Sequence, residues 1–118
     1  MFTKKNSQGY IRPIAGIEQK TLTYGEKTLL TEFLLKQGHT LPRHSHPNEQ
    51  IGYLVKGKIN LSIADQIFET EAGDSWCIPG NIEHGAEIIE DSIAIEVFSP
   101  VREDYLPKTI SGLQNAEK

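Results

Sequence analysis

Cysteine is almost missing from this chain of 118 residues, which has only Cys77. A single cysteine excludes an internal disulfide framework, and a reducing, cytoplasmic setting is the default expectation. Long apolar runs are missing too: the longest, such as Ile51 to Val55, are far too short to span a bilayer. Segment 1–8 lacks the apolar stretch of a secretory signal, so we expect no export.

An excess of positive charge is also missing. The chain has 12 Lys and Arg against 16 Asp and Glu, a formal net charge of −4 at pH 7. This balance gives no reason to expect binding to nucleic acid or to an anionic membrane surface. With 37% hydrophobic and 24% charged residues, the composition is that of an ordinary globular protein. The length predicts one domain over residues 1–118.

Helical periodicity is nearly absent, and short β-type runs separated by turn residues take its place. Many short strands at this spacing predict an all-β fold of two antiparallel sheets, with a barrel core over about 10–100. We expect a helical turn at 102–105 and a loosely ordered tail from about 108. The expected strands are 11–17, 20–24, 28–36, 50–55, 58–64, 67–71, 75–78, 85–90 and 93–98.

The last expected strand alternates between two faces, one of which is wholly apolar. Ile93, Ile95 and Val97 share one face, and Ala94, Glu96 and Phe98 share the other. If Glu96 and Phe98 line an internal cavity, the three β-branched residues need a cover from outside. A second sheet or a second subunit would provide one, so we expect a homodimer.

Histidine is scarce, yet three of the four histidines form a pattern. In an extended segment, residues i and i+2 point to the same side, so His44 and His46 present two rings to one spot. His84 is the third candidate, brought near by the folding of the sheet. The pattern predicts a site for one divalent transition metal; the alternative is a pair of exposed histidines without a ligand. His39 lies outside the pattern and is expected at the surface.

These residues resemble the two motifs of the cupin superfamily. In the first, Gly38 is followed after five residues by His44 and His46, then by Gln50 and Gly57. In the second, Gly73 is followed after five residues by Pro79, and then by Asn81 and His84. The resemblance implies an RmlC-like double-stranded β-helix, or jelly roll. It also implies a metal site whose ligands are His44, His46, Gln50 and His84.

The chain departs from the usual motifs at three positions. Gln50 stands where Glu is usual, Asn81 replaces a Gly, and Ile88 replaces an Asn. Asn tolerates the left-handed backbone conformation, which accounts for Asn81. Gln50 can coordinate the metal or only bind a water, and the neighbouring Glu49 is a weaker rival because it should point to the opposite face.

A neutral set of three histidines and Gln50 leaves the charge of the metal uncompensated, which favours Lewis-acid chemistry. Zn, Ni, Mn or Fe all suit such donors. The segment from Glu96 to Tyr105 resembles the C-terminal Asp-x-Phe-x-Pro-x-Arg signature of small cupins of the KdgF family, with Glu96 in place of Asp. The resemblance implies a uronate-linearising enzyme, which opens 4,5-unsaturated uronates to 4-deoxy-5-ketouronates, with Glu96, Phe98 and Arg102 lining its pocket.

The same residues have alternative interpretations. Glu96 can shuttle protons and Arg102 can clamp the carboxylate of an anionic sugar, or Arg102 can form a salt bridge with Glu103 or Asp104. Aromatic side chains at two positions can stack on a sugar or pack in the core, and the single cysteine is expected to be an inert buried thiol. Those aromatic residues are Tyr53 and Trp76.

Two other functions remain open at this point. A cupin dioxygenase using Fe or Ni is the first, and a non-catalytic module that binds a sugar is the second. Consumption of oxygen would favour the dioxygenase. Ligand binding without turnover would favour the binding module.

Overall fold

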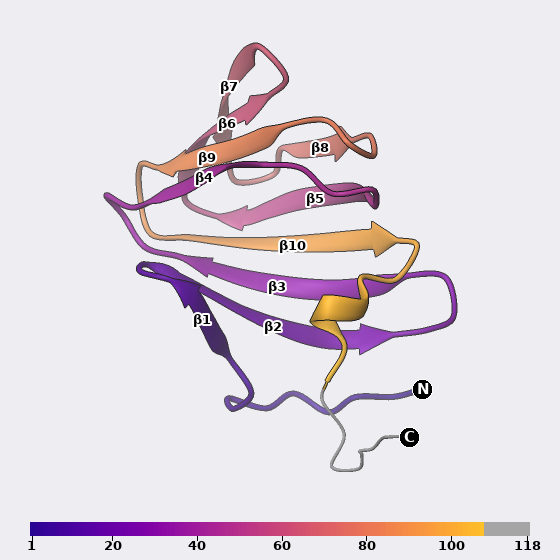
Figure 1. Ribbon diagram of the computed structural model, residues 1–118. Helices are drawn as coiled ribbons and strands as arrows, with labels where there is room; N and C mark the ends of the chain where they lie inside the picture. The colour runs from indigo at the N-terminus through magenta and orange to yellow at the C-terminus, as the bar shows by residue number, and fades with distance from the viewer. Residues whose placement is uncertain (108–118) are drawn as a thin grey trace.

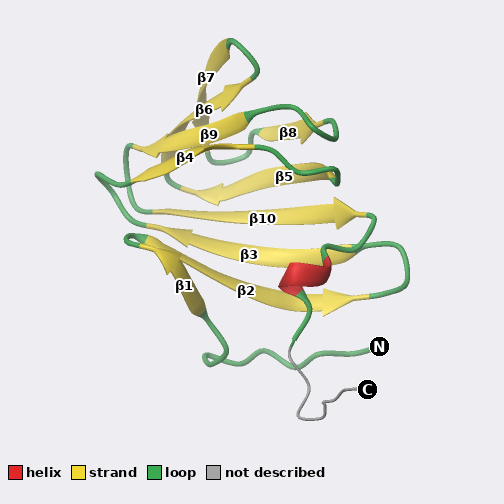
Figure 2. Cartoon of the chain, in the orientation of Figure 1, coloured by secondary structure: helices red, strands yellow, loops and turns green. Residues whose placement is uncertain are grey.

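A computed structural model of the protein describes residues 1–107, and the tail expected from about residue 108 lies outside them. Ten strands, one more than the nine expected, form two antiparallel sheets (Figures 1 and 2). The arrangement in two antiparallel sheets confirms the expected fold class. The strands are β1 (Ile11–Ile14), β2 (Ile17–Tyr24), β3 (Leu29–Leu35), β4 (Thr40–His44), β5 (Glu49–Lys56), β6 (Lys58–Ile63), β7 (Gln66–Glu71), β8 (Ser75–Ile78), β9 (His84–Ile88) and β10 (Ser92–Ser99).

The larger sheet has the order β1-β2-β3-β10-β5-β8, and the smaller one has the order β4-β9-β6-β7. Their inner faces meet in an apolar core to which both contribute, for example Phe33 and Leu54 from the larger sheet and Leu61 and Ile88 from the smaller. A 3₁₀ turn, Glu103–Tyr105, lies over β2 and β3 (Figure 1), at the place where a helical turn was expected. Among residues 1–107, no helix is long and apolar enough to span a bilayer.

The strand expected at 11–17 is in fact two strands. β1 ends at Ile14, and a turn through Ala15 and Gly16 leads into β2, which begins at Ile17. Gly16 has a φ of 80°, a left-handed conformation that Gly adopts without steric cost. The prediction of one continuous strand was therefore wrong.

The pattern of β10 confirms its expected alternation. Ala94, Glu96 and Phe98 are buried on the inner face, whereas Ile93, Ile95 and Val97 are half-buried on the outer face. Because β10 lies between β3 and β5, near the middle of the larger sheet, its inner side chains point into the barrel interior. Glu96 and Phe98 thus reach the interior from the centre of the sheet.

Candidate metal centre

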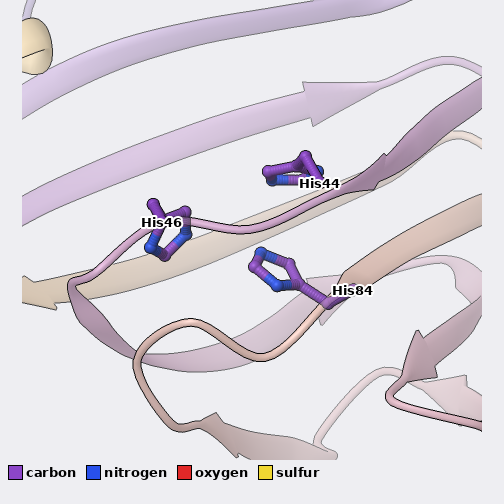
Figure 3. Close-up of side chains that lie close together, drawn as sticks. All are labelled: His44, His46 and His84. Atoms are coloured by element: carbon purple, nitrogen blue, oxygen red, sulfur yellow. The ribbon is translucent and has the colours of Figure 1, made fainter.

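Three histidines meet at one end of the smaller sheet (Figure 3). His44 ends β4 and His84 begins β9, and the two are direct cross-strand partners. His46 follows in the loop after β4, and one potential ligand atom from each ring lies within 4.8 Å of the others. Ring centroids are 4.3 Å apart for His44 and His84 and 5.0 Å apart for His46 and His84. The three side chains lie close enough together to hold one metal ion.

Each of these rings contacts a backbone carbonyl through its Nδ1 atom, at 2.8 to 3.0 Å. A carbonyl can only accept, so Nδ1 carries the hydrogen in each ring and the neutral tautomer leaves a lone pair on Nε2. Backbone contacts of this kind fix the orientation of a metal-binding ring. The three acceptor carbonyls belong to Pro42, Asn48 and Ile82.

The Nε2 atom of His84 is buried and has no hydrogen-bond partner among the described residues. Burial is the main cause that lowers the pKa of His84 to about 4; the hydrogen bond to the Ile82 carbonyl acts in the opposite direction, and the nearby charges of His44, His46 and Arg102 add to the lowering. Burial and the charge of Arg102 also lower the pKa of His46. These rings are therefore neutral at pH 7, which is the form that binds metal. An unpartnered, unprotonated nitrogen beside two others fits a divalent transition metal.

Gln50 lies on the inner face of β5 and is 5% exposed. Its Oε1 atom is 2.7 Å from Nε2 of His46, and its Nε2 donates a hydrogen bond to Oε1 of Glu96. Because the Glu96 oxygen accepts the amide hydrogen, the amide oxygen must face His46. With the hydrogen of His46 on Nδ1, the lone pair of its Nε2 atom and a lone pair of the Gln50 Oε1 atom then face the same space. This is the arrangement expected of two neighbouring ligands of one cation.

Glu96 is 9% exposed. Burial raises its pKa to about 7, while hydrogen bonds from Gln50 and Trp76 and the charge of Arg102 act in the opposite direction. Trp76 donates its indole N–H to Oε1 of Glu96 at 3.3 Å. A carboxyl group with a pKa near 7 can give or take a proton at neutral pH.

Phe98 and Arg102 extend the site beyond the histidines. The rings of Phe98 and His46 lie edge to face with centroids 5.6 Å apart. The Arg102 guanidinium lies 5.2 Å from the Phe98 centroid and 3.9 Å from that of Tyr105. It also forms a salt bridge with Asp104 at 2.6 Å. This ion pair was the alternative to a role of Arg102 in binding the carboxylate of a sugar. The Nε and Nη2 atoms of Arg102 make the two hydrogen bonds to Asp104.

A tight turn supports the loop that carries His46. The backbone N–H of Asn81 donates to the carbonyl of His46 at 2.7 Å. Asn81 has a φ of 68°, the left-handed conformation that Asn tolerates. A Cβ on Gly80 would lie 2.3 Å from the carbonyl oxygen of Pro47, so only glycine allows this close approach. The turn and the loop therefore fix each other.

Several residues considered in the sequence lie away from the histidines. Tyr53 is on the outer face of β5 and 49% exposed, opposite to Gln50, because their positions differ by an odd number of residues. Glu49 shares that outer face, and His39 packs against Gly16. The expectation of a buried Cys77 was wrong: the thiol is exposed and lies 3.8 Å from Glu49.

Thr31 is a polar residue of the interior that was not among the residues expected in the site. It is fully buried on β3, its hydroxyl has no hydrogen-bond partner among the described residues, and it pairs across strands with Glu96. In the sequence, Leu29, Phe33 and Leu35 share its face. A single hydroxyl within an otherwise apolar strand face was the available signal.

Solved structures of similar shape are known. A KdgF from a Halomonas species is 27% identical, with a TM-score of 0.84, and the match covers 90% of this chain and 100% of that one. An RmlC-like cupin from Shewanella frigidimarina is 25% identical, with a TM-score of 0.83, over 90% of this chain and 96% of that one.

Sequence comparison gives a consistent result. The pectin degradation protein KdgF of Dickeya dadantii is 28% identical over 93 residues, which are 77% of this chain and 84% of that protein. The profile of the cupin domain family Cupin_2 matches residues 31–99, which include the three histidines, Gln50 and Glu96. This match covers more than half of the chain and agrees with the two-sheet fold, and the protein therefore belongs to the cupin family.

Proposed function

We propose that this protein is a metal-dependent enzyme of carbohydrate breakdown that linearises 4,5-unsaturated monouronates to 4-deoxy-5-ketouronates. One observation carries the proposal: Gln50 contacts His46 with its amide oxygen and Glu96 with its amide nitrogen. A carboxyl group able to move protons thus lies directly beside the candidate metal ligands. The similarity to the pectin degradation protein KdgF supports a sugar acid as the substrate.

His44, His46 and His84 would hold the metal, with the amide oxygen of Gln50 as a fourth ligand. All four donors are neutral, and Zn, Ni, Mn or Fe suits them. When bound, the ion supplies a Lewis acid that polarises a hydroxyl or carbonyl oxygen of the substrate. The buried, unpartnered Nε2 of His84 supports this assignment.

The reaction is an isomerisation that needs no oxidant or second substrate. The anomeric hydroxyl loses its proton, a C1 carbonyl forms, and the bond between C1 and the ring oxygen breaks. The ring oxygen leaves as an enolate, which takes a proton at C4 and becomes the 5-ketone. Glu96, whose pKa burial raises to about 7, is the residue that would accept the first proton and return one to carbon.

Arg102 and Phe98 would bind the sugar. The Nη1 atom of Arg102 makes no hydrogen bond among the described residues, since Asp104 contacts only Nε and Nη2. That free edge can bind the substrate carboxylate while Asp104 and Tyr105 hold the guanidinium in place. Phe98, in contact with His46, would form the wall between the metal and Arg102.

Incubation of the metal-loaded protein with a 4,5-unsaturated monouronate tests the proposal. We expect loss of the ultraviolet absorbance of the conjugated alkene, faster than the spontaneous rate and without consumption of oxygen. The chelator-treated protein and Glu96→Gln should both lose this acceleration. A metal-loaded protein no faster than the uncatalysed reaction would overturn the proposal, and uptake of oxygen would point to a dioxygenase instead.

We further propose a homodimer, formed through the outer face of the larger sheet. Ile51 and Val55 on that face are 53% and 47% exposed, and β10 adds Ile93, Ile95 and Val97 beside them. On β5 and β10 the side chains of this face are mostly apolar, as on a covered face, although Glu32 and Glu49 also lie on it. A mass of one chain in light scattering at micromolar concentration would contradict the dimer.

We also propose a reducing, cytoplasmic setting, which the lone free cysteine supports.

A further inference from the structure

Three residues lie side by side on the inner face of the larger sheet. Gly52 on β5 is the cross-strand partner of both Glu96 on β10 and Trp76 on β8. A Cβ on Gly52 would lie only 2.2 Å from Cε2 and Nε1 of the Trp76 ring. The indole therefore occupies the space that a side chain at position 52 would fill, and it reaches across β5 to the carboxylate of Glu96.

Both hydrogen bonds to Glu96 use the same oxygen. Oε1 accepts from the amide of Gln50 and, at 3.3 Å, from the indole of Trp76. Among residues 1–107, both side-chain hydrogen bonds to Glu96 end on Oε1 and none reaches Oε2. Two donors on one oxygen fix the rotation of the carboxyl group and leave its second oxygen for other chemistry.

We propose that Trp76 is a positioning residue, which holds Oε1 of Glu96 so that Oε2 faces the substrate. Gly52 makes this contact possible because it leaves room for the indole. The inference rests on the proposed function, in which Glu96 moves the protons. It gives Trp76 a role as a hydrogen-bond donor to Glu96 rather than as a stacking surface for the sugar.

Replacement of the indole N–H tests this role without a change in shape. Trp76 is the only tryptophan, so growth with β-(3-benzothienyl)alanine exchanges this one ring for a bicyclic ring of the same size that lacks the N–H. Loss of a hydrogen bond to the carboxyl group that moves the protons should lower kcat about ten-fold or more. KM should stay within about two-fold, and the metal content should not change. An unchanged kcat would overturn the proposal.

A second measurement does not depend on activity. The single indole N–H gives one resonance in a proton–nitrogen spectrum, and a hydrogen bond to Glu96 moves it downfield. Glu96→Ala should move it upfield, whereas Glu49→Ala, on the exposed outer face, should leave it in place. A resonance that Glu96→Ala does not move would overturn the contact even in an active enzyme.

The two measurements separate this inference from the proposed function. Turnover of the uronate with an unmoved indole resonance would leave the function standing and reject the role of Trp76. Absence of turnover in the parent protein, together with the expected shift of the resonance, would reject the reaction. The catalytic part of the inference would then fall with it, and only the contact would stand.

Discussion

At the scale of single residues, Gln50 joins the two halves of the site. Its amide oxygen faces His46 and its amide nitrogen faces Glu96, so one side chain contacts both the candidate metal ligands and the candidate proton carrier. A glutamate at this position would place two carboxylates in contact, and their repulsion would raise the pKa of one of them. The neutral amide avoids that repulsion and leaves Glu96 free to titrate on its own.

His84 gives a direct prediction about metal binding. Its Nε2 is buried without a partner, so His84→Ala removes one of three converging nitrogen donors. We expect the affinity for Zn²⁺ to fall by about 100-fold or more, measured by competition with a chromogenic chelator. His39→Ala is the matched control, because His39 lies outside the cluster and should leave the affinity unchanged. Equal affinities of the two variants would reject the assignment.

The pKa shifts of Glu96 and His84 have opposite effects on stability in the metal-free protein. The raised pKa of Glu96, about 7 against 4.5 in the unfolded chain, makes the free energy of unfolding fall as pH rises over that interval. The lowered pKa of His84, about 4 against 6.5 in the unfolded chain, makes the free energy of unfolding rise with pH between pH 4 and pH 6.5. Each effect amounts to about 3 kcal/mol, so the two largely offset each other in the parent protein, and the lowered pKa of His46 adds to the effect of His84.

Glu96→Gln should reveal the contribution of His84 to the pH dependence of stability. In the presence of a chelator, the free energy of unfolding of this variant should rise by about 3 kcal/mol from pH 4 to 6.5. Urea denaturation at a series of pH values measures it. A variant with the same shallow pH dependence as the parent protein would contradict the prediction.

Sequence could identify many of the interior residues but not their contacts. The spacing of the motifs predicted that His44, His46 and His84 lie together, and the alternation along β10 predicted that Glu96 points into the barrel. The link between Gln50 and Glu96 depends on the register of β5 against β10, which no local pattern contains. The position of the indole depends likewise on the pairing of Gly52 with Trp76.

At the scale of elements, the strand most important for the site was the hardest to predict. β4 was absent from the expected strands, and its segment contains Pro42, a residue that central strands exclude. β4 is an edge strand that pairs only with β9, so a missing N–H is tolerated there. From β3 onward the other strands lie close to their expected ranges, because their apolar residues alternate between clear turn signals, whereas the boundary between β1 and β2 was misplaced.

The turn at Gly80 should control both stability and metal binding. In Gly80→Ala, the new Cβ would lie 2.3 Å from the Pro47 oxygen, so the loop that carries His46 must shift. We expect a loss of about 1–3 kcal/mol in the free energy of unfolding and a lower affinity for Zn²⁺. Gly25→Ala is the control, since nothing lies within 4 Å of a Cβ there. If both variants bound Zn²⁺ like the parent, the turn would have no part in the site.

At the scale of the whole molecule, the outer face of the larger sheet is the surface through which we propose that two copies pack. Its inner face meets the smaller sheet, and its outer face carries exposed Ile51 and Val55. Two copies packed through this face would bury both and form a symmetric interface. The dimer would then have four sheets stacked in layers, with one candidate metal centre inside the barrel of each copy.

Ile51→Glu should separate such a dimer. A charge on each copy at the centre of a symmetric interface repels its counterpart and loses its hydration, so we expect the mass in light scattering to halve. Ile67→Glu is the matched control, because Ile67 is 74% exposed on β7 of the smaller sheet. A dimer that survived Ile51→Glu would place the interface elsewhere.

The division of the histidines between an edge strand and its only neighbour has a consequence for local motion. His44 is on β4 and His84 on β9, so a bound ion would cross-link the edge strand of the smaller sheet to its neighbour. Edge strands open more readily than central ones, and a ligand that bridges two strands suppresses that opening. Addition of Zn²⁺ should slow hydrogen exchange at the amides of β4 far more than at those of β3 and β10. The ion would then contribute to keeping the barrel closed.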